Sequence, residues 1–353
     1  MSSTGNKLNI LIAYNAVASS PDPDTISEAA VMDEVAAVSR AVQELGHNAE
    51  TFGVSDIAKD LARILKLKPN MIFNLCEGFR QASRHEMHIA ALWELLDIPY
   101  SGSPPMALGL GQNKILAKRL FESRMIHTPE YQIYTKIPLD VSLEFPLIVK
   151  PACEDASLGL TQNSLVRDFS QLQDQVGRLL NKYRQPVLVE RYIHGREFNI
   201  SLLGNELPKV LPISEIDFSR LQSGMPWITS YEAKWLPDHP LYRKTPAICP
   251  ARLDSHLKSR LEDIAIRVFR LLGGRDYGRV DTRVDDRGWI YVLEFNPNPD
   301  ISPDAGYARA VRAADMGYTD FIRFILAEVQ RRKPESARGN TKTFSPTATG
   351  NTL

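Results

Sequence analysis

The sequence predicts a mixed fold of the α/β class with α+β parts, divided among three domains. Its 353 residues are enough for two or three domains of ordinary size. Strand and helix patterns alternate over the first hundred residues, which is typical of an open α/β domain. Two strands joined by a tight polar turn near the C-terminus indicate a separate antiparallel sheet. We therefore expect domains at 1–110, 111–204 and 205–332, followed by a tail at 333–353.

The first domain begins with a short apolar run, Leu8–Tyr14, which predicts a buried strand. Helical periodicity follows over Ala29–Leu45 and stops at Gly46, a residue suited to a helix C-terminus. Met71–Leu75 predicts a second strand and His85–Leu96 a second helix. This order predicts an open α/β arrangement.

The central domain is predicted to be small and of the α+β type. Lys114–Met125 reads as a helix, and Phe145–Lys150 and Pro186–Glu190 read as strands. A further helix is expected at Phe169–Lys182, between those two strands.

The C-terminal domain contains a long amphipathic helix at Leu257–Leu272, which Asp254 or Ser255 could cap. Gly278–Val284 and Trp289–Phe295 predict two strands, because Asp285-Asp286-Arg287-Gly288 between them is a strong hairpin signal. A helix at Thr319–Arg331 is expected to close the fold. Beyond Lys333 the chain is rich in Pro, Ser, Thr, Gly and Asn, a composition typical of a disordered tail.

Composition argues against several classes of function. Lys+Arg and Asp+Glu both total 42, so the chain lacks the basic excess of proteins that grip nucleic acid. No apolar run is long enough to span a bilayer, so no membrane partner is expected. Cys76, Cys153 and Cys249 match no zinc or disulfide spacing, which favours a reducing, cytoplasmic location.

The predicted C-terminal hairpin carries a candidate metal site. Glu294 and Asn296 are two residues apart and so face the same side of one strand, while Asp281 lies on the paired strand. Carboxylate and amide oxygens suit Mg²⁺, a hard cation. Arg279 shares the face of Asp281 and could stabilise negative charge that grows beside the metal. The alternative is a solvated hairpin with polar residues on its outer face.

Two lysines are candidates for binding phosphate. Lys150 ends a predicted strand, and the small-residue loop Ala156-Ser157-Leu158-Gly159 that follows could lay backbone N–H groups over phosphates. Lys114 heads a helix in the same half of the chain. Each lysine alone is also compatible with an ordinary surface position.

The segment from Val187 to Ile193 could present backbone groups to an adenine edge, and Glu197 could accept hydrogen bonds from ribose hydroxyls. An ordinary interdomain connection fits the same spacing. Other nucleotide or nucleophile motifs are missing: the sequence has no GxGxxG, no GxxxxGK[ST], no GxSxG and no HExxH.

Taken in chain order, short motifs spread over roughly residues 70–330 resemble the D-alanine–D-alanine ligases and their ATP-grasp relatives. They are Ile98-Pro99-Tyr100-Ser101-Gly102-Ser103, Asn113-Lys114, Ile148-Val149-Lys150-Pro151, Leu188-Val189-Glu190, Gly195-Arg196-Glu197-Phe198, Tyr231-Glu232-Ala233-Lys234, Cys249-Pro250-Ala251, Gly278-Arg279-Val280-Asp281 and Leu293-Glu294-Phe295-Asn296. The resemblance implies a three-domain ATP-grasp fold. It consists of an N-terminal α/β domain and two ATP-grasp subdomains, the second of which binds metal.

The resemblance also implies roles for individual residues. Lys114, Lys150 and Lys234 would contact the phosphates of ATP together with the loop of Ser157; Glu190, Arg191, Tyr192 and Ile193 would hold adenine, and Glu197 the ribose. Asp281, Glu294 and Asn296 would bind two Mg²⁺ ions, which Mn²⁺ can replace, and Arg279 would support the transition state. In the family reaction, ATP phosphorylates a carboxylate, an amine attacks the acyl-phosphate, and phosphate and ADP leave.

The departures from the family pattern concern the amino-acid substrates. Asn15 to Thr25 lacks the family's glycine-rich turn with its serine and glutamate, and Glu28 or Glu34 is the candidate substitute. Ala156 and Ala305 stand where the family has serines, Trp235 where it has a tyrosine, and Glu77 where it has a histidine. Glu77 is therefore counted with Arg279 and Lys234 among the candidate catalytic residues. Losing hydrogen-bonding hydroxyls changes which substrate a site can satisfy.

Three functions follow as hypotheses. The first is an ATP- and Mg²⁺-dependent ligase, expected to be a homodimer, that joins an amino acid to an acceptor other than D-alanine; serine or threonine joined to mycosporine-glycine is one candidate pair. The second is a true D-alanine–D-alanine ligase of cell-wall synthesis. The third is a nucleotide-binding protein without ligase activity.

Overall fold

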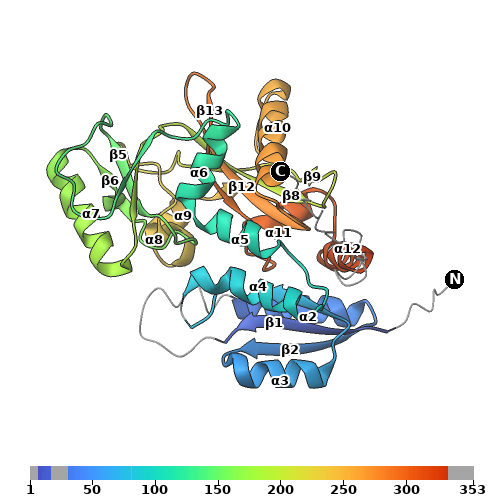
Figure 1. Ribbon diagram of the computed structural model, residues 1–353. Coiled ribbons are helices and arrows are strands. Elements are labelled where there is room, and N and C mark those ends of the chain that lie inside the picture. The colour runs from blue at the N-terminus through green and yellow to red at the C-terminus, as the bar shows by residue number, and fades with distance from the viewer. Residues whose placement is uncertain (1–6, 17–30, 81, 333–353) are drawn as a thin grey trace, which may run out of the picture.

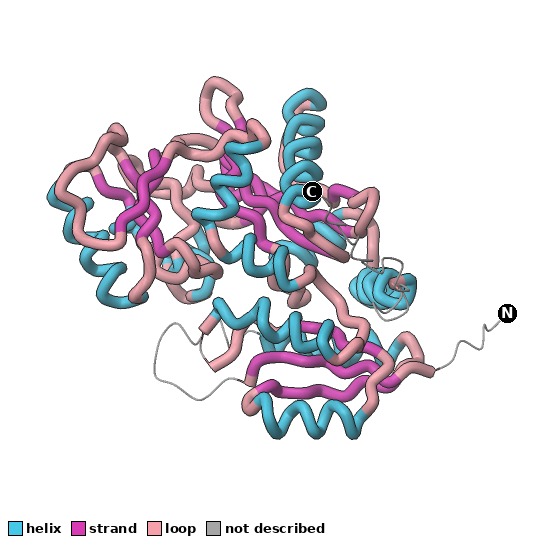
Figure 2. Tube along the Cα trace, in the orientation of Figure 1, coloured by secondary structure: helices cyan, strands magenta, loops and turns pink. Residues whose placement is uncertain are grey.

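In the computed structural model of the protein, residues 7–16, 31–80 and 82–332 are described. Within them lie three sheets, each with helices packed on it (Figures 1 and 2). The first sheet, with strands β1 and β2, lies below the large C-terminal sheet in Figure 1, and the four-stranded sheet with β5 and β6 stands to one side. The mixed α/β fold class is confirmed.

The first sheet is parallel, with the strand order β2-β1-β3. Side chains alternate along β1, so Ile10 and Ile12 pack in one cluster with α2 and α12, while Leu11 and Ala13 pack with α3 and α4 on the other face. The elements of this part are β1 (Asn9–Asn15), α2 (Val31–Glu44), β2 (Asn48–Val54), α3 (Ile57–Leu67), β3 (Met71–Leu75), α4 (Glu86–Leu95) and α5 (Pro105–Gln112).

The second sheet has the order β4-β7-β5-β6 and is antiparallel throughout. The apolar stripe of α7 covers it, with Leu172, Val176 and Leu179 fully buried against the strands. The elements are α6 (Lys114–Ser123), β4 (Tyr131–Tyr134), β5 (Leu147–Pro151), β6 (Leu165–Val166), α7 (Phe169–Tyr183) and β7 (Val187–Arg191).

The third sheet is the largest, with the order β11-β10-β8-β12-β13 and β9 paired with β8. Helix α10 packs on one of its faces, and Asp254 caps that helix through the backbone N–H of Leu257 at 2.8 Å. The elements are β8 (Arg196–Leu203), β9 (Lys209–Val210), β10 (Ser214–Ile216), α8 (Tyr231–Trp235), α9 (Pro240–Lys244), β11 (Ala247–Ile248), α10 (Ser255–Leu271), β12 (Tyr277–Val284), β13 (Ile290–Asn296), α11 (Gly306–Ala313) and α12 (Tyr318–Arg331).

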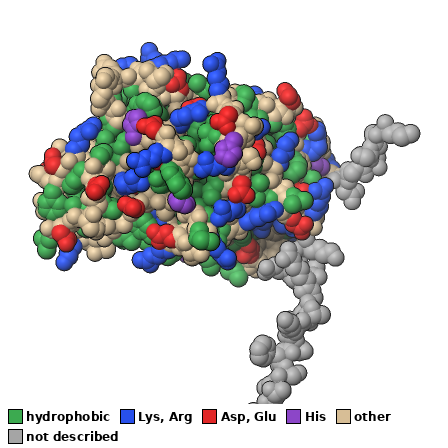
Figure 3. Space-filling view, turned by 90° about the horizontal axis from the view of Figure 1, so that it is seen from above, with side chains coloured by type: hydrophobic (Ala, Val, Ile, Leu, Met, Phe, Trp, Pro, Cys, Tyr) green, Lys and Arg blue, Asp and Glu red, His purple; other side chains and the backbone are tan. Residues whose placement is uncertain are grey.

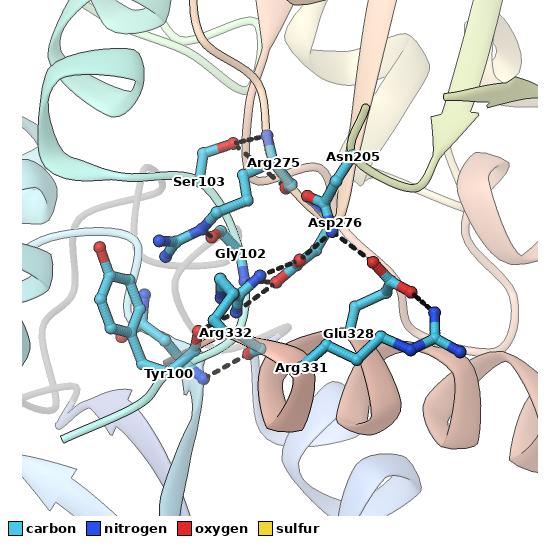
Figure 4. Close-up of polar contacts among 11 residues, drawn as sticks. Tyr100, Gly102, Ser103, Asn205, Arg275, Asp276, Glu328, Arg331 and Arg332 are labelled. Carbon is cyan, nitrogen blue, oxygen red and sulfur yellow. Dashed lines mark hydrogen bonds and ion pairs between the residues drawn. The ribbon is translucent and has the colours of Figure 1, made fainter. Parts of the chain in front are cut away.

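A buried aspartate joins the first and third sheets (Figure 4). Asp276, fully buried, accepts hydrogen bonds from the backbone N–H of Gly102 at 2.9 Å and from the side-chain amide of Asn205 at 3.2 Å. Arg332 forms an ion pair with the same carboxylate and donates to the carbonyl of Tyr100 at 2.6 Å. The φ of Asp276 is +63°, a left-handed conformation that aspartate tolerates better than most residues. The end of α12 is thereby tied to the loop that leaves the first sheet.

The predicted helices and strands are confirmed with shifts of at most two residues at the ends that the structure describes. The predicted tail and Glu28 lie outside the described residues. Among the features that differ from expectation, Asn48–Val54 is a strand that no periodicity indicated, and Glu197 stands on the eight-residue strand β8 instead of in a connection. On the face seen in Figure 3, basic and acidic side chains are interspersed. None of the described helices is long and apolar enough to cross a membrane.

Candidate active site

A cavity of about 970 Å³ lies between the second and third sheets. Strands β5 and β7 contribute one wall, β8, β12 and β13 the other, and α8 and the loop after β5 close it. Almost all of the candidate residues line it: Lys114, Lys150, Ser157, Glu190, Arg191, Tyr192, Ile193, Glu197, Lys234, Arg279, Asp281, Glu294 and Asn296. Glu77, the remaining candidate, is not among the described residues that line this cavity.

The candidate metal ligands meet by strand pairing. Asp281 on β12 lies opposite Glu294 on β13, and Arg279 lies opposite Asn296. Opposed residues of an antiparallel pair share a face and have Cβ atoms about 5 Å apart. Two carboxylates so placed repel each other unless a cation lies near.

Cationic side chains compensate this repulsion in the structure. The Nε of Arg279 lies 2.7 Å from Oδ1 of Asp281, and the Nζ of Lys114 lies 3.3 Å from Oε2 of Glu294. Burial acts to raise the pKa of the Glu294 carboxyl, but Lys114, Lys150 and Arg279 outweigh burial and lower that pKa to about 2. A carboxylate pair with an amide beside it fits the oxygen ligands that Mg²⁺ prefers.

Two lysines share one buried carboxylate on the wall of the cavity. Glu190, 1% exposed, forms ion pairs with Lys150, at 2.5 Å from Nζ to Oε2, and with Lys118, which is 0% exposed. Burial acts to raise the pKa of Glu190, but the two ammonium groups lower it overall. Lys118 was not among the sequence candidates, because a lysine on an amphipathic helix reads as a surface residue.

The segment after β7 passes along the same wall. Its backbone is fixed by hydrogen bonds from the N–H of Arg191 to the carbonyl of Glu130 at 2.8 Å and from the N–H of Tyr192 to the carbonyl of Pro146 at 3.1 Å. Arg191, Tyr192 and Ile193 thus form a fixed edge of the cavity. Just beyond, a Cβ on Gly195 would lie 2.0 Å from the carbonyl oxygen of Val284, so the chain can pass here only with glycine.

Lys234 enters the cavity from α8, whose first turn is capped by Ser230. Burial lowers the pKa of Lys234, and Arg279 adds to the effect. Across from it, the hydroxyl of Ser157 donates to the carbonyl of Thr229 at 3.0 Å, and the indole N–H of Trp235 donates to the carbonyl of Ala156 at 2.8 Å. These two bonds connect the loop after β5 to α8 and to Thr229 in the segment that precedes α8.

Acidic side chains gather near one end of the cavity. Asp300 and Asp304 line it, and Glu34, 4% exposed, accepts a hydrogen bond from the backbone N–H of Ile301 at 2.5 Å. Burial raises the pKa of Glu34 well above its usual value, and the charges of Asp300 and Glu77 raise it further. Glu34, one of the two glutamates considered for the first-substrate site, therefore lies near Asp300.

The chain matches the family model described as the D-ala D-ala ligase C-terminus over residues 121–327. It is 36% identical over 319 residues to the uncharacterized protein y4sG of Sinorhizobium fredii (strain NGR234), covering 88% of this chain and 90% of that protein. It is 32% identical over 290 residues to D-alanine–D-alanine ligase B of Pseudomonas putida (strain KT2440), covering 79% and 84%. A solved structure of D-alanine–D-alanine ligase from Bacillus anthracis complexed with ATP superposes with a TM-score of 0.73 at 21% identity, over 94% of this chain and all of that one.

Proposed function

This chain belongs to the D-alanine–D-alanine ligase family, and from that premise we propose that it is an ADP-forming ligase that uses ATP and Mg²⁺ to join an amino acid to a second substrate. The observation that carries the proposal is the convergence, in one cavity, of Lys114, Lys150 and Lys234 with the oxygen ligands of β12 and β13. Such a site can hold a polyphosphate and its counter-ion and then neutralise charge during phosphoryl transfer.

In the proposed reaction, a substrate carboxylate oxygen attacks the γ-phosphorus of ATP, and the bond to ADP breaks. An amine nitrogen then attacks the acyl carbon, phosphate leaves with the former carboxylate oxygen, and the amine loses a proton. Mg²⁺ held by Asp281, Glu294 and Asn296 would neutralise the phosphate charge. Lys114, Lys150 and Lys234 would orient the phosphates, and Arg279 would stabilise the negative charge on the reacting centre.

The segment at Arg191, Tyr192 and Ile193 would hold the adenine, with Glu190 beside it. The buried Glu190 is paired with Lys118 and Lys150, so its charge can be maintained without solvent. The division into an N-terminal domain and two ATP-grasp subdomains, with boundaries near 110 and 204, belongs to the same proposal.

We further propose that the substrates differ from D-alanine. The loop contact that links Trp235 to Ala156 involves an indole N–H and a backbone carbonyl, so these two positions offer no serine or tyrosine hydroxyl. Ala305 lines the cavity without a hydroxyl, and Asp300 and Asp304 add negative charge to that end. A site so altered would disfavour a substrate that depends on those hydroxyls. Serine or threonine with mycosporine-glycine is one pair to test, and the cell-wall reaction is the alternative.

Trapping of the acyl-phosphate tests the activity without knowledge of the amine. Hydroxylamine would attack the acyl carbon in place of the amine and give a hydroxamate and phosphate. Wild-type protein with Mg·ATP, hydroxylamine and a panel of amino acids and other carboxylic acids should yield a hydroxamate with at least one acid. Asp281→Asn should yield none, and Asp286→Asn, an exposed turn residue of the same hairpin, should behave like wild type. Binding of ATP with no hydroxamate from any acid would favour a nucleotide-binding protein without ligase activity.

A further inference from the structure

The ribose end of the proposed ATP site is built around a cross-strand pair of opposite charge. Arg283 on β12 lies opposite Glu197 on β8, and both line the cavity. The guanidinium donates twice to Oε2 of Glu197, from Nε at 3.1 Å and from Nη2 at 2.7 Å. The hydroxyl of Thr229 donates to Oε1 at 2.9 Å.

These contacts use most of the accepting capacity of the carboxylate. An ionised carboxylate offers about four lone-pair sites, two on each oxygen. Arg283 takes both sites on Oε2, and Thr229 takes one of the two on Oε1. One site on Oε1 is left for a ligand.

Arg283 is not free to move away when a ligand arrives. The residue is 5% exposed, and its Nη1 donates to the carbonyl of Ile193 at 2.7 Å. It also donates to the carbonyl of Trp227, and its guanidinium lies 5.3 Å from the ring centroid of Tyr192. Releasing Glu197 would leave buried carbonyls and a buried cation without partners, which is costly.

We propose that Glu197 recognises a single ribose hydroxyl of the nucleotide, because Arg283 and Thr229 occupy the rest of its accepting capacity. The inference rests on the proposed ATP site. It implies a specific tolerance: of 2′-deoxyATP and 3′-deoxyATP, one binds nearly as well as ATP, and the other binds much more weakly. A glutamate with both oxygens open would instead reject both analogues.

Thr229 offers the sharper test, because Thr229→Val removes one hydroxyl while preserving shape. The variant frees a second acceptor site on Oε1, so ATP can then engage Glu197 through both hydroxyls. The analogue that wild type binds as well as ATP should bind to Thr229→Val several-fold to about tenfold more weakly than ATP does. Thr319→Val removes a hydroxyl that donates to Glu44 on α2, and it should keep the wild-type pattern.

The experiment measures the Kd of ATP, 2′-deoxyATP and 3′-deoxyATP by isothermal titration, with Mg²⁺ and full-length protein. We expect wild type to bind one analogue within about threefold of ATP and the other at least tenfold more weakly. Rejection of both analogues by wild type, equal binding of all three nucleotides, or an unchanged pattern in Thr229→Val overturns the inference. Failure of all three nucleotides to bind would overturn the proposed function itself, and with it this inference.

Discussion

Arg279 and Asp281 face the same side of β12, and the guanidinium of Arg279 forms a two-point ion pair with the carboxylate of Asp281, with N–O distances of 2.7 and 2.8 Å. Asn199 on β8 donates to the same carboxylate at 2.8 Å. A proposed metal ligand and a proposed transition-state cation are therefore directly coupled. Mg²⁺ would compete with Arg279 for the oxygens of Asp281. The guanidinium of Arg279, released from that ion pair, would then be available to the reacting phosphoryl group.

This coupling predicts a specific kinetic effect of Arg279→Ala. Because the guanidinium would act mainly on charge that develops during the reaction, kcat should fall by about a hundredfold or more, while the Kd of ATP changes little. Steady-state rates and a separate nucleotide titration measure the two quantities. A variant that loses ATP binding but keeps kcat would reject the assigned role.

Lys118 and Glu190 should be energetically coupled in ATP binding. In Lys118→Met, Lys150 would be the only cation paired with the carboxylate of Glu190, and this ion pair would hold Lys150 away from phosphate. The Kd of ATP should therefore rise about tenfold. Adding Glu190→Gln would release Lys150, and the double variant should bind ATP better than Lys118→Met. A double-mutant cycle measures this. Simple addition of the two single effects would show that the residues act independently.

The same lysine predicts a pH effect. Burial, helped by the charge of Lys150, lowers the pKa of Lys118 to about 8, although Glu190 favours its charged form. As pH rises from 7 to 9, Lys118 loses its proton, and the Kd of ATP should rise in wild type but stay flat in Lys118→Met. The sign for stability is opposite: the folded pKa lies below the usual value, so between about pH 8 and 10.5 the unfolded chain binds more protons, and this group's contribution to stability increases. Deprotonation of Lys118 therefore does not destabilise the fold at pH 9, so unfolding caused by this group cannot explain weaker ATP binding there. If the Kd of ATP depends on pH equally in wild type and in Lys118→Met, Lys118 is not the cause of the pH effect.

Two neighbouring arginines at the end of α12 should differ in their importance for stability. Arg332 contacts the buried Asp276, whereas the side chain of Arg331 is 73% exposed and pairs with Glu328, which keeps Asn205 as a second partner (Figure 4). Arg332→Ala should lower the free energy of unfolding by about 2–4 kcal/mol, because a buried carboxylate loses its cation. Arg331→Ala should change it by no more than about 0.5 kcal/mol. Denaturant unfolding of both variants makes the comparison.

A related prediction concerns the chain beyond this contact. A protein ending after Lys333 should melt at the temperature of the full chain, because Arg332 and its partners are retained. A protein ending after Gln330 should melt several degrees lower, because both arginines are lost. A large loss of melting temperature in the longer of the two truncations would show that residues after Lys333 contribute to folding.

The sequence predicted part of the hairpin chemistry, because alternation along one strand determines that Glu294 and Asn296 share a face, as do Arg279 and Asp281. Asp281 lies opposite Glu294 only because the register shifts between Asp281 and Thr282, which neither the alternation nor the turn at Asp285–Gly288 indicated. Long helices with one apolar stripe, such as α7 and α10, were predicted for the same reason.

The residues that periodicity missed are those whose environment comes from distant segments. Lys118 is buried because Glu190, on a strand far along the chain, lies beside it, and Arg283 is buried because the segments around Ile193 and Trp227 supply carbonyl acceptors. Strand β2 was missed because its alternation is weak: only Phe52 and Val54 are buried. Helix α11 was missed because it is short and rich in alanine and arginine.

The central claim, an ATP-dependent ligase with substrates other than D-alanine, is tested most directly by phosphate release from Mg·ATP. D-alanine, L-serine, L-threonine and glycine are each supplied alone and with candidate acceptors such as mycosporine-glycine, and Asp281→Asn serves as the blank. We predict phosphate release that requires an amino acid together with a second, different acceptor. Rapid release with D-alanine alone, accompanied by the D-alanyl dipeptide, would contradict the account and identify the cell-wall reaction.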